Sequence, residues 1–354
     1  MSFQPCSIGI TAIFLSFPCQ FELFSGFSDL ARIEEAEAGL GRAQAQLLAV
    51  QQAELGRGAA AYYAVLQEKS LIDSLARVKA LSSEMLELAR ETKKNGGNSD
   101  ATWLKAQKST LDQESKLVGQ KHRLARAVGD YVRYFGVEPD VNTMNFVTIG
   151  DEKMPVSQED LLSQIANSAD VLASFRKAEM SQARVKREKS SRYPTLSLNL
   201  AHERDNDSFI SNGNGGIGLS RTDETSLELS LKWELSALLY SRHAINKAAS
   251  TSMSDRAKAR ALLKRLEGQA VKLWDDYRHY HHEIRLLDEI RQKESRLEEI
   301  EADKIAAGGG KRQGLLKLKM SNERTVQRLI RATHGLEQTK VRILALINQM
   351  TADV

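Results

Sequence analysis

Histidines cluster in one short stretch of the chain, and histidine pairs on a helix are a common beginning of a metal site. In His279-Tyr280-His281-His282-Glu283, His279 shares a helix face with His282 and Glu283, three and four positions further on. A third ligand at a suitable spacing is not evident, and Tyr280 lies on an apolar stripe that the histidines flank. The stretch therefore predicts a helix surface without a metal, and we expect no cofactor.

Paired carboxylates are the second candidate for chemistry, since two nearby carboxyl groups can act as general acid and base. The pairs Glu34-Glu35 and Glu298-Glu299 lie in segments with charges of both signs, as solvated helix faces do. The sequence contains no Walker loop, HExxH or GxSxG motif. We therefore predict that the protein is not an enzyme and has no catalytic residues.

The composition favours long helices over an enzyme-like core. The 354 residues are 42% hydrophobic, yet they include only 5 prolines and 6% aromatics. The 50 basic and 46 acidic residues are interleaved, which leaves a formal charge of +4 and no basic stripe. This pattern argues against nucleic acid as a partner.

The elements that carry these side chains form an internal repeat with an offset of 212 positions. Phe21-Glu22-Leu23 aligns with Trp233-Glu234-Leu235, and Gly96-Gly97 aligns with Gly308-Gly309, without a gap over about a hundred residues. Each copy has a heptad seam, formed by Ile33, Ala36, Leu40, Ala43, Leu47 and Val50 in the first and by Leu266, Ala270, Leu273, Tyr277, Tyr280, Ile284 and Leu287 in the second. Two unrelated coiled coils that share heptads are the alternative. We predict two domains, 1–150 and 151–354, with one repeat in each.

Each repeat is expected to contain a long antiparallel helical hairpin. Proline is absent from about 30–95 and about 242–307, so each first helix can extend ~100 Å at about 1.5 Å per residue. Glycines follow both helices, and glycine supplies the positive φ of a helix C-cap and a tight turn. The second helices are expected over 99–135 and 311–350, with Ser99 as an N-cap. The tips, near 95–98 and 307–311, contain Asn95, Gly96, Gly97, Gly308, Gly309 and Lys311.

Two strands precede the second hairpin, after a shorter helical stretch that begins near Gln158. The first strand alternates Leu196, Leu198 and Leu200 with polar residues, and the second alternates Leu227, Leu229, Leu231 and Trp233 with Glu228, Ser230, Lys232 and Glu234. The polar segment 205–216 between them has the composition of a long mobile loop. Two short strands are not stable alone, and we expect no local sheet for them to join. They are therefore predicted to pair with other copies in a closed barrel.

In a membrane barrel, apolar side chains face lipid and polar side chains face the lumen. The predicted lumen residues are Ser197, Asn199, Glu228, Ser230 and Lys232. Tyr193 and Trp233 fit the aromatic girdles at the membrane interfaces. An amphipathic hairpin that lies on a soluble core is the alternative.

The first repeat is shorter than the second at its beginning. The 76 residues of 157–232 precede Trp233, whereas 20 residues precede Phe21. We therefore expect the opening helices and first strand of the first repeat, roughly 56 residues, to be absent. The run Ile8–Phe17 is too short for a membrane helix and has no Lys or Arg before it, so it does not predict a signal peptide.

Taken together, these features resemble the outer-membrane factor family, the TolC-like efflux and secretion channels. Three motifs carry the resemblance. The segment Arg192-Tyr193-Pro194-Thr195-Leu196-Ser197-Leu198 is similar to the family's P-x-L-x-L strand start, and Phe21-Glu22-Leu23-Phe24-Ser25-Gly26-Phe27 with Ile33-Glu34-Glu35-Ala36 is similar to its strand-to-helix crossing. The third motif is Leu315-Leu316 after the Gly308 tip, since the family has a leucine pair after a glycine. The resemblance covers about 13–350. The segment 235–242 departs from the family's Phe-Asp-x-Gly-like turn.

The resemblance implies a mainly α fold, with long antiparallel coiled-coil hairpins in two repeats and short β-strands that contribute to a trimeric membrane β-barrel. With one strand fewer per protomer, the barrel would have about nine strands instead of twelve. The homotrimer would be the exit duct of a tripartite efflux pump or type I secretion system, in the cell outer membrane with a periplasmic helical domain gated at its tip. Its partners would be outer-membrane lipid, a periplasmic adaptor (membrane fusion protein) and an inner-membrane transporter. A soluble coiled-coil scaffold and a non-functional truncated remnant are the alternatives.

Overall fold

The computed structural model describes residues 9–11, 14–96, 100–212 and 216–350. The predicted tip residue Gly97 and the predicted N-cap Ser99 lie outside these ranges. Positions 1–8, at the start of the stretch considered as a signal peptide, also lie outside them. Within the described ranges, no helix is both long and apolar enough to cross a membrane.

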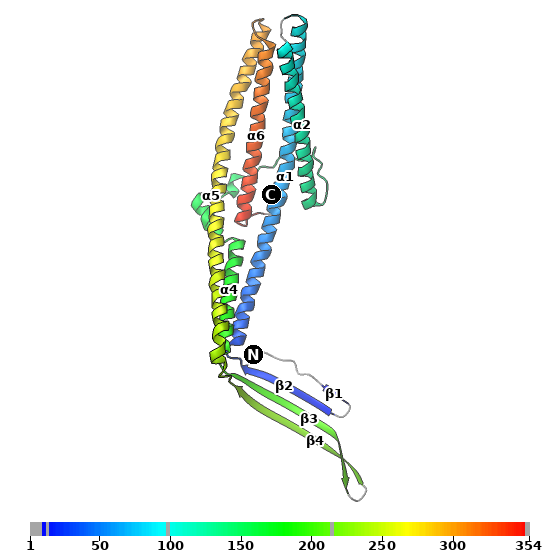
Figure 1. Ribbon diagram of the computed structural model, residues 1–354, viewed down its shortest axis with the longest axis vertical. Coiled ribbons are helices and arrows are strands. Elements are labelled where there is room, and N and C mark those ends of the chain that lie inside the picture. Colours follow the sequence, from blue (N-terminus) through cyan, green and yellow to red (C-terminus); the bar gives the residue numbers. More distant parts are fainter. Residues whose placement is uncertain (1–8, 12–13, 97–99, 213–215, 351–354) are drawn as a thin grey trace. The chain divides into compact units, whose positions relative to one another are not determined.

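The chain is mainly helical, with two long helical hairpins and one sheet (Figure 1). In chain order the elements are β1 Gly9–Thr11, β2 Phe14–Phe24, α1 Ser28–Lys94, α2 Asp100–Phe135, the 3-10 turn η1 Asp151–Lys153, α3 Gln158–Ala166, α4 Ala169–Ser190, β3 Thr195–Asn212, β4 Gly216–Lys232, α5 Ala237–Ala306 and α6 Arg312–Leu346. The fold predicted from sequence, long helical hairpins combined with short strands, is confirmed.

The helix limits repeat along the chain with the offset found in the sequence. α1 ends at Lys94 and α5 ends at Ala306, and α2 begins at Asp100 and α6 begins at Arg312. Both pairs of positions are 212 residues apart. Proline is absent from all four helices, and glycine follows α1 and α5 closely, so local signals place these helix ends well.

The shorter helical stretch predicted from near Gln158 is broken into α3 and α4 at Asn167 and Ser168. Ser157 caps α3, since its Oγ accepts a hydrogen bond from the Asp160 N–H at 3.2 Å. Asn167 ends α3 at φ −100° and ψ 7°, and its N–H bonds to the Gln164 carbonyl at 3.1 Å. Asn competes for local backbone hydrogen bonds, which explains the interruption.

The strands form an antiparallel sheet in the order β1-β2-β3-β4. Two predictions were therefore wrong. The second strand of the first repeat, β2, pairs with β3, so a local sheet exists within one chain. The segment 205–216 is not a long loop, because β3 continues to Asn212 and pairs with β4 from Gly216 onward, with one register shift between Asp205 and Ser208. Cross-strand hydrogen bonds outweigh the weak β-propensity of these residues.

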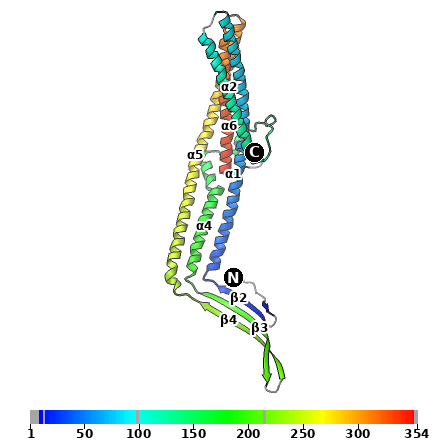
Figure 2. The ribbon, with the colours of Figure 1, turned by 45° about the vertical axis from the view of Figure 1, so that its right-hand side comes forward.

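The chain divides into two compact units, 1–46 with 170–263 and 47–169 with 264–354. The first unit contains the sheet, α4 and the sheet-side turns of α1 and α5; Figure 2 shows α4 between these two helices. Alanines dominate its helical core, which lets helix backbones approach closely, and they are Ala31, Ala38, Ala173, Ala178, Ala183, Ala248 and Ala259. The second unit buries larger side chains, among them Leu75, Leu287, Leu316 and Ile343. The division into domains 1–150 and 151–354 remains a prediction about the sequence repeats.

The two predicted heptad seams differ in the structure. In α5, Leu266, Ala270 and Leu287 are buried, and the other four predicted seam residues are half-buried. In α1, all six predicted seam residues are exposed, and Leu40 and Leu47 are 61% and 60% exposed. A neighbouring face of α1, rich in alanine, packs within the chain instead. The heptad pattern therefore identified an apolar stripe on α1 that the structure leaves exposed.

Candidate functional site

The register of the sheet places the predicted lumen residues side by side. Ser197 lies opposite Ser230, and Asn199 lies opposite Glu228. Residues two positions apart share a face of a strand, so Lys232 lies on the same face as Ser230. The five residues predicted to line a lumen therefore form one polar face that crosses β3 and β4.

Strand β2 extends this polar face with two residues that the sequence reasoning did not include. Gln20 lies opposite Asn199, and Glu22 lies opposite Ser197. Their alternation with apolar residues in β2 was the available signal. It could not be used without knowing that β2 pairs with β3.

The opposite face of the sheet is apolar and largely uncovered. Leu227, Leu229 and Leu231 of β4 are 69%, 63% and 69% exposed. Burying a leucine side chain contributes about 1.5–3 kcal/mol relative to exposing it to water. A row of three such residues on one strand therefore indicates a surface that contacts lipid or another chain.

The predicted interface aromatics lie just outside the strands, where the sheet joins the helices. Tyr193 precedes β3 and Trp233 follows β4, and each is about half exposed, at 50% and 54%. The indole Nε1 of Trp233 donates to the carbonyl of Arg192 at 3.3 Å. Each ring thus presents apolar surface beside polar groups, as aromatic residues at membrane interfaces do.

The crossing from β2 to α1 adds two aromatic rings to this corner. Gly26 and Phe27 both have positive φ, 64° and 69°. A Cβ at Gly26 would lie 2.8 Å from the Ser190 carbonyl oxygen, so only glycine fits there. The Phe27 ring packs edge-on against Phe24 and Tyr193, at centroid distances of 5.1 and 5.5 Å. The alignment of the two repeats included this crossing, but it did not show that Phe24 and Phe27 pack where the sheet joins the helices.

The first predicted tip ends α1 with a glycine in the left-handed region. Gly96 has φ 75°, and its N–H donates to the Lys93 carbonyl at 3.1 Å. Asn95 and Gly96 are exposed, and a Cβ at Gly96 would meet no atom within 4 Å. Lys93 bridges the hairpin, because its Nζ lies 2.6 Å from Asp100 Oδ1 and 4.6 Å from the ring centroid of Trp103.

The second predicted tip has similar geometry. Gly308 has φ 82° and donates to Ile305 O at 3.0 Å, while the Gly309 N–H bonds to Lys304 O at 2.9 Å. Lys311 is exposed and precedes α6 without a side-chain capping bond.

The two hairpins are linked close to their tips. Arg312 Nη2 lies 2.6 Å from Glu84 Oε1, so the first residue of α6 contacts α1. The described tip residues thus form polar, accessible turns.

The histidine stretch of α5 makes ion contacts and no metal cluster. His279 Nε2 lies 3.4 Å from Glu283 Oε2, and His281 Nε2 lies 3.7 Å from Asp151 Oδ1. His282 is exposed. Among the described residues, no group of three or more His, Cys, Asp or Glu side chains is arranged to hold a metal ion.

A buried ion pair on α6 holds the long connection between α2 and α3, and the sequence reasoning missed it. Glu337 and Lys340 are 1% and 2% exposed. Glu337 Oε2 accepts the Ile149 N–H at 2.8 Å, and Lys340 Nζ donates to the Ile149 carbonyl at 2.7 Å. The two charged groups lie 3.3 Å apart. We call Glu337, Lys340 and Ile149 the clasp. Charges three positions apart in an apolar helix segment were the only signal in the sequence.

Asp151 extends the clasp toward α5. Its Oδ1 lies 2.8 Å from Lys340 Nζ and accepts a hydrogen bond from Tyr277 Oη at 3.3 Å. Burial raises the pKa of Asp151, but the hydrogen bond and charge of Lys340 outweigh it and hold this pKa below its ordinary value. Burial, followed by the Asp151 charge, raises the pKa of Tyr277 to about 12.

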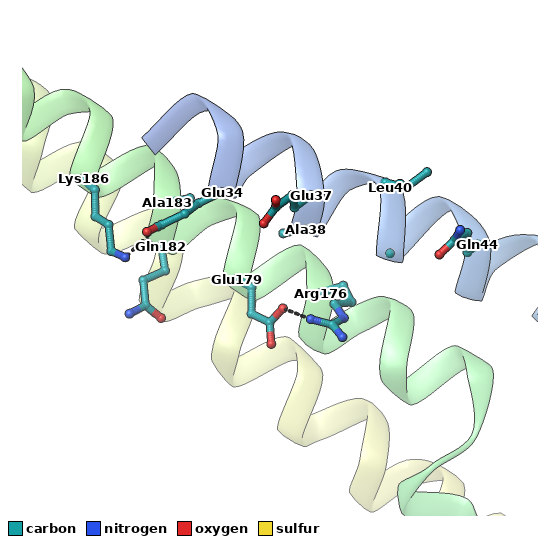
Figure 3. Close-up of a pocket in the computed structure, with 11 residues that line it drawn as sticks. Glu34, Glu37, Ala38, Leu40, Gln44, Arg176, Glu179, Gln182, Ala183 and Lys186 are labelled. Atoms are coloured by element: carbon teal, nitrogen blue, oxygen red, sulfur yellow. Dashed lines mark hydrogen bonds and ion pairs between the residues drawn. The ribbon is translucent and has the colours of Figure 1, made fainter. Parts of the chain in front are cut away.

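A charged groove of about 450 Å³ lies between α1 and α4 (Figure 3). Lys186 Nζ donates to Glu34 Oε2 at 2.6 Å, and Arg176 pairs with Glu179 at 2.8 Å. Most charges in the groove are thus neutralised locally, and the lining suggests no reaction.

Comparison with known proteins gives a consistent fold. No protein-family profile and no curated protein matches the sequence. Among solved structures, the outer membrane protein VceC from Vibrio cholerae matches with a TM-score of 0.76 at 13% identity, over 95% of this chain and 79% of VceC. The outer-membrane channel OprN matches with a TM-score of 0.76 at 16% identity, over 95% of this chain and 75% of OprN.

CusC, whose structures describe folding and transmembrane channel formation, matches with a TM-score of 0.76 at 11% identity, over 98% of this chain and 81% of CusC. At these identities the likeness concerns the fold. It extends over the strands and both helical hairpins, since almost the whole chain is covered. The protein therefore has the fold of the TolC-like outer-membrane channels.

Proposed function

We propose that the protein is one protomer of an outer-membrane exit duct and not an enzyme. The observation that carries the proposal is the two-faced sheet. Ser197, Asn199 and Glu228 lie on a polar face, and the other face exposes Leu227 and Leu229. A barrel with apolar side chains toward lipid and polar side chains toward water requires this arrangement. The shared fold with outer-membrane channels supports it.

We propose that three copies close the barrel. Among the described strands, β4 pairs only with β3, so its outer edge of 17 residues has no partner strand. A long unpaired strand edge beside exposed leucines is an aggregation risk unless another strand covers it. The α1 stripe that contains Leu40 and Leu47 is also left exposed by the described residues of the chain. A ring of copies would cover both features.

We propose that the helical tips meet a periplasmic adaptor tied to an inner-membrane transporter, and that the duct opens there. Asn95, Gly96, Gly308, Gly309 and Lys311 are exposed polar or glycine positions in short turns. The cargo class is left open between efflux substrates and secreted proteins.

Membrane fractionation tests the duct. A heat-resistant trimer in the outer-membrane fraction, with ion conductance after reconstitution into planar bilayers, is the expected result. Glu228→Lys should lower cation selectivity, and Glu228→Asp, which keeps the charge, should not. A soluble elongated dimer would instead support a coiled-coil scaffold, and a membrane-free aggregate would support a non-functional remnant.

Photo-crosslinking tests the tip. A photoreactive amino acid at Lys311 should crosslink to a co-expressed periplasmic adaptor, whereas the same group at exposed Lys264 should not. Equal crosslinking at both positions would refute the assignment of the tip.

A further inference from the structure

The three crossings between sheet and helices meet at one corner, where α1, α4 and α5 reach the strands (Figures 1 and 2). Arg192 lies at its centre. Its Nε donates to Ser241 Oγ of α5 at 3.1 Å, and its carbonyl accepts the Trp233 indole N–H at 3.3 Å. The neighbouring Tyr193 ring packs on Phe27 of the third crossing. The guanidinium is therefore anchored on one side by a neutral hydroxyl.

The cations at this corner lack carboxylate partners. None of Lys189, Arg192 and Arg242 has an Asp or Glu oxygen within 4.0 Å in the part of the chain that the structure describes. Lys189 and Arg242 are also exposed. We call these three residues the cation collar; Lys232 is not part of it, because it belongs to the polar face of the sheet.

Cations further along α4 behave differently. Lys177 pairs with Asp255 at 3.7 Å, Lys186 with Glu34 at 2.6 Å, and Arg184 and Arg187 pair with Glu35. The cations of α4 up to Arg187 are therefore paired within the protein, whereas Lys189, at the end that meets the sheet, has no carboxylate partner among the described residues. The ion pairs of α4 thus end close in the chain to the exposed ring of Tyr193.

Acidic groups do not cancel the cation collar. Asp29 pairs with Arg32 at 3.7 Å, and Glu188 lies 4.0 Å from Arg187. Glu234 accepts a hydrogen bond from Ser236. Among the described residues, no carboxylate within 4.0 Å therefore neutralises the three cations of the collar.

The combination of cations and half-exposed aromatics fits the headgroup layer of a bilayer. Trp and Tyr rings favour this depth, and Lys and Arg side chains extend along apolar surface to place their charges there. Arg binds phosphate oxygens through two parallel N–H bonds, and anionic lipids attract each nearby cation. The exposed Trp233 and Tyr193 lie directly beside Arg192 and Lys232 in the chain.

We propose that the cation collar binds the phosphate groups of anionic phospholipids, in the leaflet next to the helices. This rests on the proposed function, because it requires the sheet to be in a membrane. Each cation removed is expected to weaken binding to anionic membranes about five-fold.

The test uses the full chain, titrated against vesicles and separated by flotation. One set of vesicles is pure phosphatidylcholine, and the other contains three parts phosphatidylglycerol to seven parts phosphatidylcholine. The natural protein should bind the anionic vesicles at least ten-fold more tightly. Lys189→Gln combined with Arg242→Gln should remove most of this preference, and the fold should tolerate both changes because both side chains are exposed.

The matched control is Arg260→Gln combined with Arg265→Gln, which removes the same charge from exposed positions about 25–35 Å further along α5. It should keep the preference. Arg192→Lys, which keeps the charge and loses the two-pronged donor, should weaken anionic binding by less than the Lys189 and Arg242 pair. Equal binding of the natural protein to both vesicles, or equal losses in the collar and control pairs, would overturn the headgroup proposal alone. Failure to bind either vesicle would refute membrane insertion, and with it the proposed function.

Discussion

Breaking the clasp is the sharpest test of how the α2–α3 connection is held. Lys340→Met removes the ammonium group that lies 3.3 Å from Glu337 and 2.7 Å from the Ile149 carbonyl. Glu337 is 1% exposed, so its charge would remain buried without a counter-ion. Removing one partner of a buried ion pair costs about 3–5 kcal/mol. We therefore expect the free energy of unfolding to fall by about that amount.

The double variant separates the ion pair from the rest of the site. Replacing Glu337 and Lys340 together with methionine leaves no buried charge unpaired. The Ile149 N–H and carbonyl lose their partners, at about 1–3 kcal/mol, and the solvent-exposed Asp151 carboxylate loses its contact with Lys340. The double variant should therefore lose less stability than the sum of the single variants. Lys317→Met, at an exposed position of the same helix, should change stability by about 0.5 kcal/mol or less.

Urea unfolding gives the free energies, and hydrogen exchange locates the effect. The Ile149 amide donates to Glu337 Oε2, so its exchange should accelerate in Lys340→Met and Glu337→Met, with the middle of α6 still protected. If Lys340→Met lost no more stability than Lys317→Met, or if Ile149 stayed protected, the clasp would not hold the connection. Additive losses in the double variant would show that the two charges act independently.

Three further predictions concern acid sensitivity, helix packing and the tip. Burial lowers the pKa of His334 to about 4, so the unfolded chain binds a proton at this residue more readily than the folded protein does. The free energy of unfolding should therefore be highest above pH ~6.5 and fall by up to about 3 kcal/mol as the pH falls toward 4, and His334→Leu should flatten that part of a stability–pH curve. A Cβ at Gly335 would lie 2.7 Å from the Tyr280 ring, so Gly335→Ala should destabilise by about 1–3 kcal/mol, whereas Gly268→Ala, in open space, should stabilise by up to about 1 kcal/mol in urea unfolding. Gly308→Ala should cost about 1 kcal/mol through its positive φ, and Gly308→Asn should recover part of it; equal losses in the same urea measurement would refute a conformational cause.

Local signals in the sequence were sufficient for the hairpins. A glycine pair after a long segment without proline marks the end of a helix, and the observed ends at Lys94 and Ala306 keep the sequence offset. The alternation of leucines likewise identified which residues of β3 and β4 share a face. These features depend on residues close together in the chain, which sequence patterns report directly.

Long-range pairings could not be read in the same way. Ile149 and Glu337 are separated by 188 positions, and nothing near either residue specifies the other. The pairing of β2 with β3 joins the first repeat to the second, and the repeat itself contains no information on that contact. The corner around Arg192 was missed for the same reason, since its partners come from three separate crossings.

Equivalent positions of the repeat also have different surroundings. Leu75 and Leu287 are both buried, at 7% and 1% exposure, whereas Ile33 is 52% exposed and its counterpart Ile245 is 8% exposed. A heptad pattern shows that a stripe is apolar, but it does not specify whether the covering surface comes from the same chain. The leucines on the α1 stripe and on β4 keep a core-like pattern without a core to enter. Exposed apolar positions of this kind indicate functional surfaces, and the proposed ring of copies in a membrane would cover both the α1 stripe and the leucines of β4.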